Sequence, residues 1–201
     1  MRQLEEYNGV FNKNLNHYIY KEKNFLTDIE CKNGIIELND HKDDWQEHEF
    51  YEPNEKKWVK LSKNFENDIK YAEDGEFTKL IVNKLWFSID RYIKFLNMPW
   101  FSGWSGYTFP RYNKYFNEKK MASHCDHIQS IFDGEKKGIP ILSCLGILNE
   151  EYEGGKFIMF EDTEIKFNAG DLIIFPSIFL YPHKVLPVTK GSRYSFISWV
   201  Y

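Results

Sequence analysis

The residues best suited to chemistry in this chain are His124 and Asp126, which are separated by a single cysteine. In an extended segment successive side chains point to opposite faces, so His124 and Asp126 share a face that Cys125 does not. An imidazole and a carboxylate on one face can bind the same metal ion. The C-terminal region offers His183 as a third ligand. Two histidines and one carboxylate can hold Fe(II) and leave coordination positions open for reactants.

Other residues compete with this ligand set. The same spacing recurs at His41-Lys42-Asp43, where the surrounding run of charged residues predicts a solvated loop. His127 lies three residues after His124, so on a strand it faces away from the ligands, and we interpret it as a residue beside the site or at the surface. Cys125 is an alternative thiolate ligand, but the same alternation points its side chain into the core.

A guanidinium follows the third ligand. Arg193 lies ten residues after His183, and on an extended strand it shares a face with Ser195, Ile197 and Trp199. A guanidinium binds a carboxylate through two parallel hydrogen bonds, and a neighbouring hydroxyl adds one more donor. This face can therefore hold the far carboxylate of a dicarboxylic ligand whose other end is bound to the metal. Without the metal residues, a lone arginine on a strand would be read as an ion-pair partner.

Length and composition narrow the class of protein. The chain has 201 residues, enough for one domain with a sizeable core, and 18% of them are aromatic. The formal charge of −4 disfavours a nucleic-acid partner. Three cysteines without paired spacing predict a reduced protein with no disulfide framework. No secretory signal and no apolar run long enough to cross a bilayer are visible, so we expect a cytoplasmic protein without a membrane partner.

The first hundred residues predict helices and edge strands. Residues 1–24 indicate an edge strand or a covering arm. Thr27 and Glu30 form a capping box that opens a helix running to about Leu38. A second helix begins near Phe77, presents an apolar face at helical spacing and ends before Pro99. Between these helices, residues 39–75 predict strands and exposed loops, with His41 and His48 at the surface.

The second half of the chain changes to short strands separated by turn residues. About eight such strands with tight turns predict a β-sandwich or jelly roll. The interval from Asn113 to Lys120 predicts a polar loop in which a substrate chain could be gripped. The predicted strands cover residues 104–112, 121–127, 139–148, 156–160, 164–167, 171–175, 181–189 and 192–201.

Taken together, these motifs resemble the iron(II)- and 2-oxoglutarate-dependent oxygenases, and the prolyl 4-hydroxylase type is the most similar branch. The resemblance covers residues 104–201. Beyond the residues named above, it is carried by Arg111-Tyr112, Leu148-Asn149, Tyr152, Gly154-Gly155, Phe157, the segment Gly170–Phe175, the segment His183–Val188, and Arg193-Tyr194 with Trp199.

The resemblance implies a mainly β fold, the double-stranded β-helix, with N-terminal helices packed on its major sheet. It implies one domain, in which residues 1–100 support a catalytic core at 101–201. His124, Asp126 and His183 would hold Fe(II), and Arg193 with Tyr112 would hold the C5 carboxylate of 2-oxoglutarate. The implied lining of the cosubstrate pocket is Leu145, Ile147, Phe175 and Val185, with Ser195 and Trp199 on the strand of the arginine.

One position departs from the family pattern. Ile147 stands where some prolyl hydroxylases carry a tyrosine that also reaches the carboxylate. Tyr112, Ser195 or a water molecule would have to supply that hydrogen bond here.

The resemblance also implies a reaction. Dioxygen and 2-oxoglutarate would be consumed, succinate and CO2 released, and an unactivated C–H bond hydroxylated, with ascorbate as a possible auxiliary reductant. A prolyl residue in a peptide or protein is the substrate we expect. Aromatic walls suit the apolar ring of proline, and proline-rich segments lose little entropy on binding. Candidates for such walls are Trp100, Trp104, Tyr107, Tyr115 and Trp199.

Two other functions stay open at this stage. An oxygenase of the same fold can act on a small molecule, another amino-acid residue or a nucleobase, although the acidic balance disfavours the nucleobase. A jelly-roll binding protein with a vestigial metal site is disfavoured by the intact ligand set and Arg193. The sequence leaves the oligomeric state and the position of hydroxylation undetermined.

Overall fold

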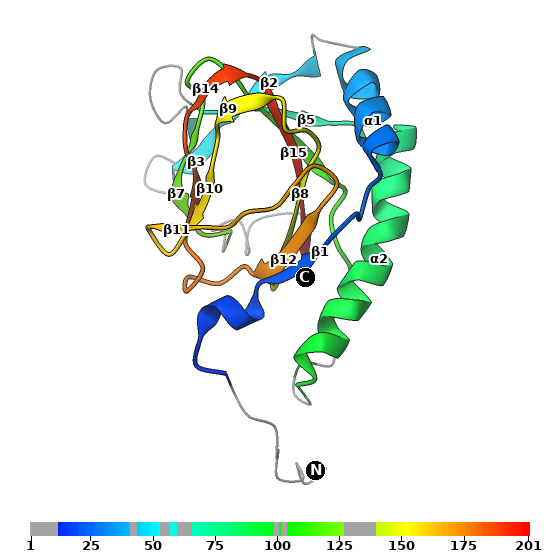
Figure 1. Cartoon of the computed structure of the whole chain (residues 1–201), viewed down its shortest axis with the longest axis vertical. Helices are drawn as coiled ribbons and strands as arrows, with labels where there is room; N and C mark the ends of the chain where they lie inside the picture. The colour runs from blue at the N-terminus through cyan, green and yellow to red at the C-terminus, as the bar shows by residue number, and fades with distance from the viewer. Residues whose placement is uncertain are drawn as a thin grey trace, which may run out of the picture.

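A computed structural model of the chain describes residues 12–40, 44–52, 57–59, 66–98, 101, 104–126 and 140–201. Figure 1 shows the strands arranged around a common interior, with the long helices to one side of them. In chain order the described elements are η1 (Leu15–Tyr18), β1 (Tyr20–Glu22), α1 (Asp28–Asp40), β2 (Gln46–Glu47), β3 (Phe50–Glu52), β4 (Lys57–Val59), β5 (Asp68–Tyr71), α2 (Glu76–Leu96), β6 (Arg111–Tyr115), β7 (Met121–His124), β8 (Leu142–Ile147), β9 (Tyr152–Gly154), β10 (Phe157–Met159), β11 (Thr163–Glu164), β12 (Leu172–Pro176), β13 (His183–Val185), β14 (Val188–Gly191) and β15 (Arg193–Val200).

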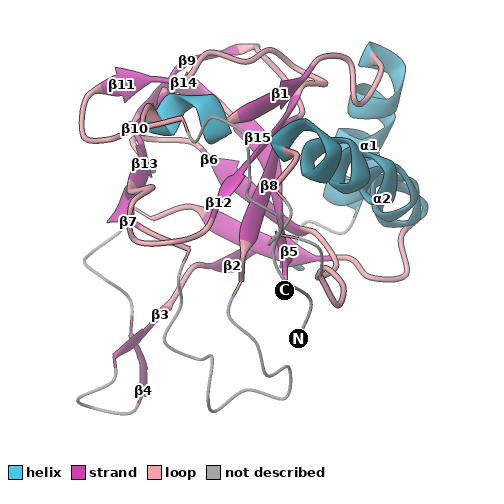
Figure 2. Ribbon diagram, turned by 90° about the horizontal axis from the view of Figure 1, so that it is seen from below, coloured by secondary structure: helices cyan, strands magenta, loops and turns pink. Residues whose placement is uncertain are grey.

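Two antiparallel sheets form the body of the molecule. The major sheet has seven strands in the order β1-β12-β8-β15-β6-β5-β2, and the minor sheet has four in the order β11-β10-β13-β7. β9 and β14 form a separate pair, and β3 pairs with β4. Figure 2 shows α1 and α2 on the side of the major sheet that faces away from the minor sheet. The arrangement confirms the predicted jelly roll with N-terminal helices packed on its major sheet.

Both predicted helices are present. The Thr27 backbone N–H donates to Glu30 Oε2 at 2.7 Å, and the Glu30 backbone N–H donates to Thr27 Oγ1 at 3.2 Å, so the predicted capping box opens α1. α2 ends at Asn97, which adopts the left-handed conformation with φ of 46°. Asparagine tolerates this conformation better than most residues do, which suits it to the end of a helix.

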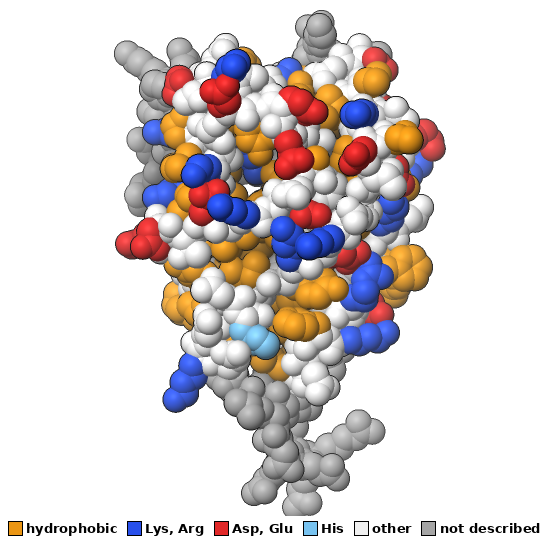
Figure 3. Space-filling model, in the orientation of Figure 1, with side chains coloured by type: hydrophobic (Ala, Val, Ile, Leu, Met, Phe, Trp, Pro, Cys, Tyr) orange, Lys and Arg blue, Asp and Glu red, His pale blue; other side chains and the backbone are white. Residues whose placement is uncertain are grey.

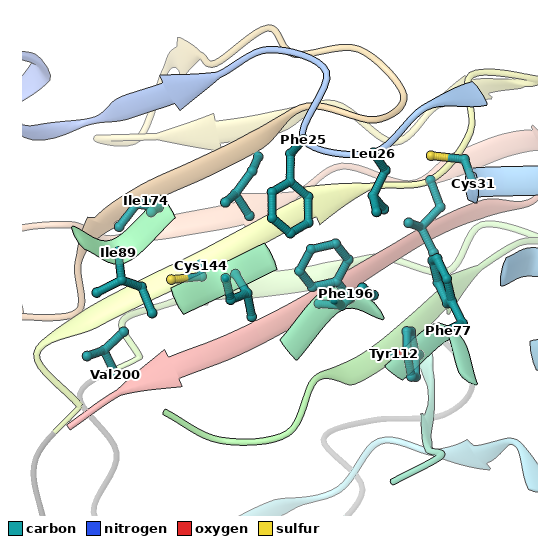
Figure 4. Close-up of a cluster of buried hydrophobic side chains, with 14 of the residues drawn as sticks. Phe25, Leu26, Cys31, Phe77, Ile89, Tyr112, Cys144, Ile174, Phe196 and Val200 are labelled. Atoms are coloured by element: carbon teal, nitrogen blue, oxygen red, sulfur yellow. The ribbon is translucent and has the colours of Figure 1, made fainter. Parts of the chain in front are cut away.

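The strands of the major sheet divide their side chains between two cores. Phe196 and Cys144 point outward and pack against the apolar face of α2, which includes Ile89 (Figure 4). A Cβ atom on Gly146 would lie 2.1 Å from the Phe196 ring, so this position has room for glycine alone. The alternate residues point inward into a second core. The inward apolar residues include Leu145, Phe157, Phe175, Val185 and Ile197.

Two strand boundaries differ from those predicted between residues 104 and 120. Residues 104–110 form no strand apart from a bridge between Tyr107 and Val200, and β6 begins directly after Pro110, which has no N–H to donate. The predicted loop beginning at Asn113 is wrong for its first three residues, which belong to β6. The buried Asn113 side chain accepts a hydrogen bond from Asn67 Nδ2 at 2.9 Å, so a polar residue is accommodated inside the sheet.

Three further predictions have definite outcomes. The predicted strand 181–189 is divided into β13 and β14, because Pro187 cannot donate to a ladder. The N-terminal edge strand is confirmed for β1, which pairs with β12, whereas residues 1–11 lie outside the described part of the chain. His48 is buried, not at the surface, because its Nε2 atom lies 3.1 Å from Arg111 Nη1. His41-Lys42-Asp43 also falls outside the described residues.

The surface has no single dominant charge on the face that Figure 3 shows. On the face shown in Figure 3, acidic and basic side chains are intermixed, with apolar side chains between them. Among the described helices, neither is both long enough and apolar enough to span a bilayer.

Candidate metal and cosubstrate site

Two strands of the minor sheet bring the predicted metal ligands together. β13 pairs with β7 in antiparallel register, and this pairing sets His183 opposite His124 with their ring centroids 4.4 Å apart. Asp126 follows two residues after the last residue of β7. Its Oδ1 atom lies 3.5 Å from His124 Nε2 and 3.7 Å from His183 Nε2. The three ligand atoms all lie within 4.8 Å of one another, which is a geometry that can hold one metal ion.

Backbone carbonyls orient both imidazoles. His124 Nδ1 lies 2.8 Å from the carbonyl oxygen of Ala122, and His183 Nδ1 lies 3.1 Å from that of Tyr181. In each case Nδ1–H can donate to the carbonyl two residues earlier, so the neutral ring keeps its lone pair on Nε2. Both Nε2 atoms face Asp126. Ring orientation by an outer hydrogen bond is characteristic of metal-binding histidines.

The carboxylate is fixed from behind by two serines. The Ser143 hydroxyl donates to Asp126 Oδ2 at 2.5 Å, and it also lies 2.8 Å from the Ser177 hydroxyl. Asp126, Ser143 and Ser177 are all buried. The second carboxylate oxygen, Oδ1, is thereby directed toward the two histidines. The sequence analysis missed these serines, since serine within a strand carries no signal of its own.

The ionisable ligands influence one another. Burial alone would raise the pKa of the Asp126 carboxyl. The neighbouring His183 and His124 and the hydrogen bond from Ser143 outweigh burial, so the pKa of Asp126 lies well below its usual range. Burial lowers the pKa of His124, yet its hydrogen bond and charge interaction with Asp126 raise it overall. Burial dominates at His183, whose pKa is lowered. The site therefore presents an ionised carboxylate and a neutral His183 near pH 7.

Arg193 is buried with part of its hydrogen-bonding capacity unused. The side chain is 1% exposed, and its Nη1 donates to Ser195 Oγ at 3.0 Å. The Nε and Nη2 atoms are buried and have no hydrogen-bond partner among the residues that the structure describes. The ring of Tyr115 lies 5.0 Å from the guanidinium carbon. An unpaired buried guanidinium is costly, so this environment fits a ligand that brings a carboxylate.

One pocket contains both the ligand set and Arg193. Leu145, Phe175 and Val185 line it, in agreement with the sequence analysis. Ile147 lines a neighbouring hollow that also contacts Arg193. Trp199 lies at neither, but its ring is 5.0 Å from the guanidinium carbon of Arg111. The donor set and the unpartnered guanidinium fit Fe(II) and a dicarboxylic acid such as 2-oxoglutarate.

The structure contradicts the role predicted for Tyr112. This residue pairs with Phe196, so its side chain faces the helices, where its hydroxyl lies 2.7 Å from Thr78 Oγ1 and its ring stacks on Phe77 (Figure 4). The tyrosine that faces Arg193 is Tyr115, three residues later and therefore on the opposite face of β6. The sequence predicts Tyr115 as an aromatic wall alone, because it does not contain the register of β6 against β15.

The structure describes only one of the two alternative metal ligands, Cys125 and His127. Cys125 is half-exposed and its thiol lies 3.5 Å from the carbonyl oxygen of Phe179, so the expectation that it points into the core is wrong. The chain leaves the strand at this point, and strict alternation no longer applies. His127 lies outside the described residues. The pocket also has lining residues to which the sequence analysis assigned no such role: Arg111, Asn113, Met121 and Phe157.

The C-terminal part of the chain matches a known protein family. The profile of the 2OG-Fe(II) oxygenase superfamily matches residues 110–201. This segment is similar to members of that superfamily, and it contains every residue that lines the pocket described above. The resemblance drawn from the motifs is thereby confirmed.

Curated relatives match slightly less than half of the chain. A PKHD-type hydroxylase from Aliarcobacter butzleri (strain RM4018) is 42% identical over 99 residues, which cover 45% of this chain and 42% of that protein. A PKHD-type hydroxylase from Xylella fastidiosa (strain M12) is 36% identical over 108 residues, covering 45% of this chain and 43% of the relative. The chain therefore spans less than half of the length of these relatives.

Solved structures share the fold over most of the chain. A Pseudomonas putida prolyl-4-hydroxylase aligns with a TM-score of 0.64 at 19% identity, covering 92% of each chain. A Trichoplax adhaerens prolyl hydroxylase, solved with a peptide fragment of the hypoxia inducible factor oxygen degradation domain, aligns with a TM-score of 0.69 at 18% identity, covering 92% of this chain and 84% of that one. These likenesses confirm the predicted double-stranded β-helix.

Proposed function

We propose that this protein is an Fe(II)- and 2-oxoglutarate-dependent dioxygenase that hydroxylates a prolyl residue in a peptide or protein. The observation that carries the proposal is one pocket in which His124, Asp126 and His183 converge beside the unpartnered guanidinium of Arg193. When bound, Fe(II) and 2-oxoglutarate supply the oxidation, in which dioxygen is consumed, succinate and CO2 are released and a C–H bond becomes C–OH.

The protein's own residues position these reactants. His124 and His183 offer Nε2 atoms that Ala122 and Tyr181 hold in place, and Asp126 offers Oδ1. Three protein ligands leave the other coordination positions for the cosubstrate and dioxygen. The preset orientation means that little side-chain freedom has to be lost when the metal binds.

Arg193 is the residue we assign to the distal carboxylate of 2-oxoglutarate. Its Nε and Nη2 atoms offer the two parallel donors that a carboxylate accepts, while Ser195 holds Nη1. Tyr115 faces the same space and takes the place that we had given to Tyr112. The apolar walls formed by Leu145, Phe175 and Val185 keep water from the ligand and strengthen its electrostatic contacts.

Two observations support a peptide as the substrate. The Trichoplax relative in fold was solved with a peptide fragment, and the Pseudomonas relative is named a prolyl-4-hydroxylase. In addition, the loop that leads from Ser177 to His183 exposes three consecutive apolar side chains, of which Phe179 is 71% exposed. An exposed apolar loop beside a metal ligand is a surface on which a peptide can bind. The other two side chains are Ile178 and Leu180.

We also propose that residues 1–100 and 101–201 act as a single domain in the cytoplasm. The cluster between α2 and the major sheet joins both halves of the chain in one core. Cys31, Cys125 and Cys144 are all free thiols, which suits a reducing compartment.

The test is turnover with a defined peptide panel. The protein is incubated with Fe(II), 2-oxoglutarate, ascorbate, oxygen and proline-containing peptides, and succinate is measured together with hydroxyproline in each peptide. We expect the two products in equal amounts with at least one peptide, and neither product with the His183→Ala variant. Succinate formation that is independent of peptide, without hydroxyproline across the panel, would favour a small-molecule substrate instead.

A further inference from the structure

A second guanidinium lies in the same pocket as the metal ligands. Arg111 is the first residue of β6 and pairs with Ile197, so its side chain is on the same face of the sheet as Arg193. It lines the pocket together with His124 and Asp126. Three residues of strand lie between Arg111 and Tyr115, the partner of Arg193 in the ladder, so the two guanidinium groups enter the pocket at different points along β6.

Arg111 is held in place by two neighbours. Its guanidinium carbon lies 5.0 Å from the centre of the Trp199 ring, and its Nη1 lies 3.1 Å from His48 Nε2. A guanidinium over a tryptophan ring is a favourable cation–π contact. These contacts fix the plane of the fork, and a fixed fork is the geometry that binds a carboxylate through two hydrogen bonds.

The neighbours of Arg111 do not balance its charge. Burial and the charge of Arg111 lower the pKa of His48 to about 3, so this imidazole is neutral and brings no negative charge. The buried Nε atom of Arg111 has no hydrogen-bond partner among the described residues. The Glu66 carboxyl accepts a hydrogen bond from the backbone of Ala122. No ion pair joins Arg111 to any acidic residue in the described part of the chain.

The charges of the other groups in the pocket leave the positive charge of Arg111 unbalanced. With the proposed cofactors bound, the positive charges of Fe(II) and Arg193 are matched by Asp126 and the two carboxylates of 2-oxoglutarate. Arg111 then contributes a positive charge that none of these groups neutralises. A substrate that enters the pocket therefore meets the fixed guanidinium of Arg111, which has N–H donors available. A negatively charged group on the substrate would accept hydrogen bonds from these donors and balance the charge of Arg111.

We infer that Arg111 determines specificity by binding a carboxylate of the substrate, either an acidic side chain close to the hydroxylated residue or a C-terminal carboxylate. The inference rests on the proposed function and adds a substrate class to it. Trp199 and His48 act as positioning residues, because they touch Arg111 and orient it.

Binding without turnover separates this role from a structural one. The full chain is loaded with Zn(II) in place of Fe(II) and with 2-oxoglutarate, and peptide affinities are measured by calorimetry. The peptides contain one proline and differ in matched pairs, with Glu or Gln next to the proline and with a C-terminal acid or amide. The Glu/Gln pairs and the acid/amide pairs distinguish the two sources of the carboxylate.

We expect the wild-type protein to bind one type of acidic peptide about 10- to 100-fold more tightly than its uncharged partner, as for a charge-assisted pair. Arg111→Gln should remove this preference and leave the affinity for 2-oxoglutarate unchanged. Arg111→Lys should restore part of it, because the charge is kept and the fork is lost. Lys94→Gln, a matched loss of one positive charge on the exposed side of α2, should change nothing.

Equal binding of charged and uncharged peptides, or a preference that survives in Arg111→Gln, would overturn the inference while leaving the proposed function in place. If the loaded protein binds 2-oxoglutarate but no peptide, the prolyl substrate is wrong, and the same comparison is then made with N-acetyl amino acids and their amides. A preference for the acids that depends on Arg111 supports the inference there, and its absence overturns it.

Discussion

The two faces of the major sheet are built from the same strands but are completed in different ways. On the outer face, Phe196 and Tyr112 pack against the helices, and the Tyr112 hydroxyl is paired with Thr78. On the inner face, Arg193 is equally buried, yet two of its donor atoms have no partner among the described residues. The outer face is complete as the chain folds, whereas the inner face needs a ligand to complete it.

This difference between the two faces predicts which substitutions affect the stability of the fold and which affect ligand binding. Truncating an outer side chain removes packing that the folded chain depends on, so the cost falls on the free energy of unfolding. Truncating an inner polar side chain removes a contact that exists when ligand is bound, so the cost falls on affinity. Substitutions on the two faces should therefore affect different measurements.

Asp126→Ala should abolish most Fe(II) binding. The substitution removes the charged ligand between two histidines, so the loss should exceed the roughly 10- to 100-fold that follows loss of an outer partner of a ligand. Metal content after anaerobic equilibration with Fe(II) is the measurement. His127→Ala is the matched control and should retain iron. A protein that keeps iron without the Asp126 carboxylate but loses it without His127 would disprove the ligand set.

Phe196→Ala should reduce the free energy of unfolding by about 3–5 kcal/mol, the usual cost of removing a buried phenylalanine. The ring fills the space that Gly146 leaves open, so a cavity results. Urea denaturation of the metal-free protein gives the value. Under conditions where the variant is folded, its affinity for 2-oxoglutarate should be close to that of the wild type. A strong loss of affinity would mean that the two faces are not independent.

Arg193→Ala should show the opposite pattern. Losing a charge-assisted pair costs about 1.5–3 kcal/mol of binding free energy, which is roughly a 10- to 150-fold weaker affinity for 2-oxoglutarate. Metal content should stay the same, and the urea midpoint of the free protein should change little, because the guanidinium has unpartnered donors there. Arg193→Lys should recover part of the affinity. A calorimetric titration that gives an unchanged affinity for the alanine variant would refute the assignment.

Much of the fold and the centre of the site could be predicted from local patterns. The capping box and the apolar periodicity of α2 depend on neighbouring residues, and the spacing from His124 to Asp126 is local too. His183 was the histidine that the C-terminal region offers as a third ligand, and Arg193 follows it by ten residues on the last predicted strand. What could not be predicted depends on pairing between distant segments. His48 lies in a polar stretch, and its burial results from contact with Arg111, far away in the sequence.

The two tyrosines of β6 show the same limit most clearly. Tyr112 and Tyr115 are three residues apart on one strand, so they must face opposite sides, and the sequence alone does not say which side is the pocket. The antiparallel pairing with β15 decides the question, because it sets Tyr115 opposite Arg193 and Tyr112 opposite Phe196. A shift of the ladder by one residue would exchange their roles.

This pair of tyrosines provides the finest test of the comparison. Tyr112→Phe removes a buried hydroxyl that lies 2.7 Å from Thr78 Oγ1, so it should lower the free energy of unfolding by about 1 kcal/mol and leave the affinity for 2-oxoglutarate unchanged. Tyr115→Phe keeps the ring beside the Arg193 guanidinium and removes the hydroxyl of a residue that lines the pocket. It should leave the free energy of unfolding nearly unchanged and weaken 2-oxoglutarate by about 2- to 10-fold, the equivalent of one neutral hydrogen bond.

Each variant serves as the control for the other, since both lose one hydroxyl from the same strand. Urea denaturation and calorimetry on the two proteins give four values, and the expected pattern is a stability loss for one and an affinity loss for the other. If Tyr112→Phe weakens 2-oxoglutarate while Tyr115→Phe does not, the original assignment of Tyr112 is right. β6 would then have to pair with β15 in a register shifted by an odd number of residues, because only such a shift exchanges the two faces of the strand.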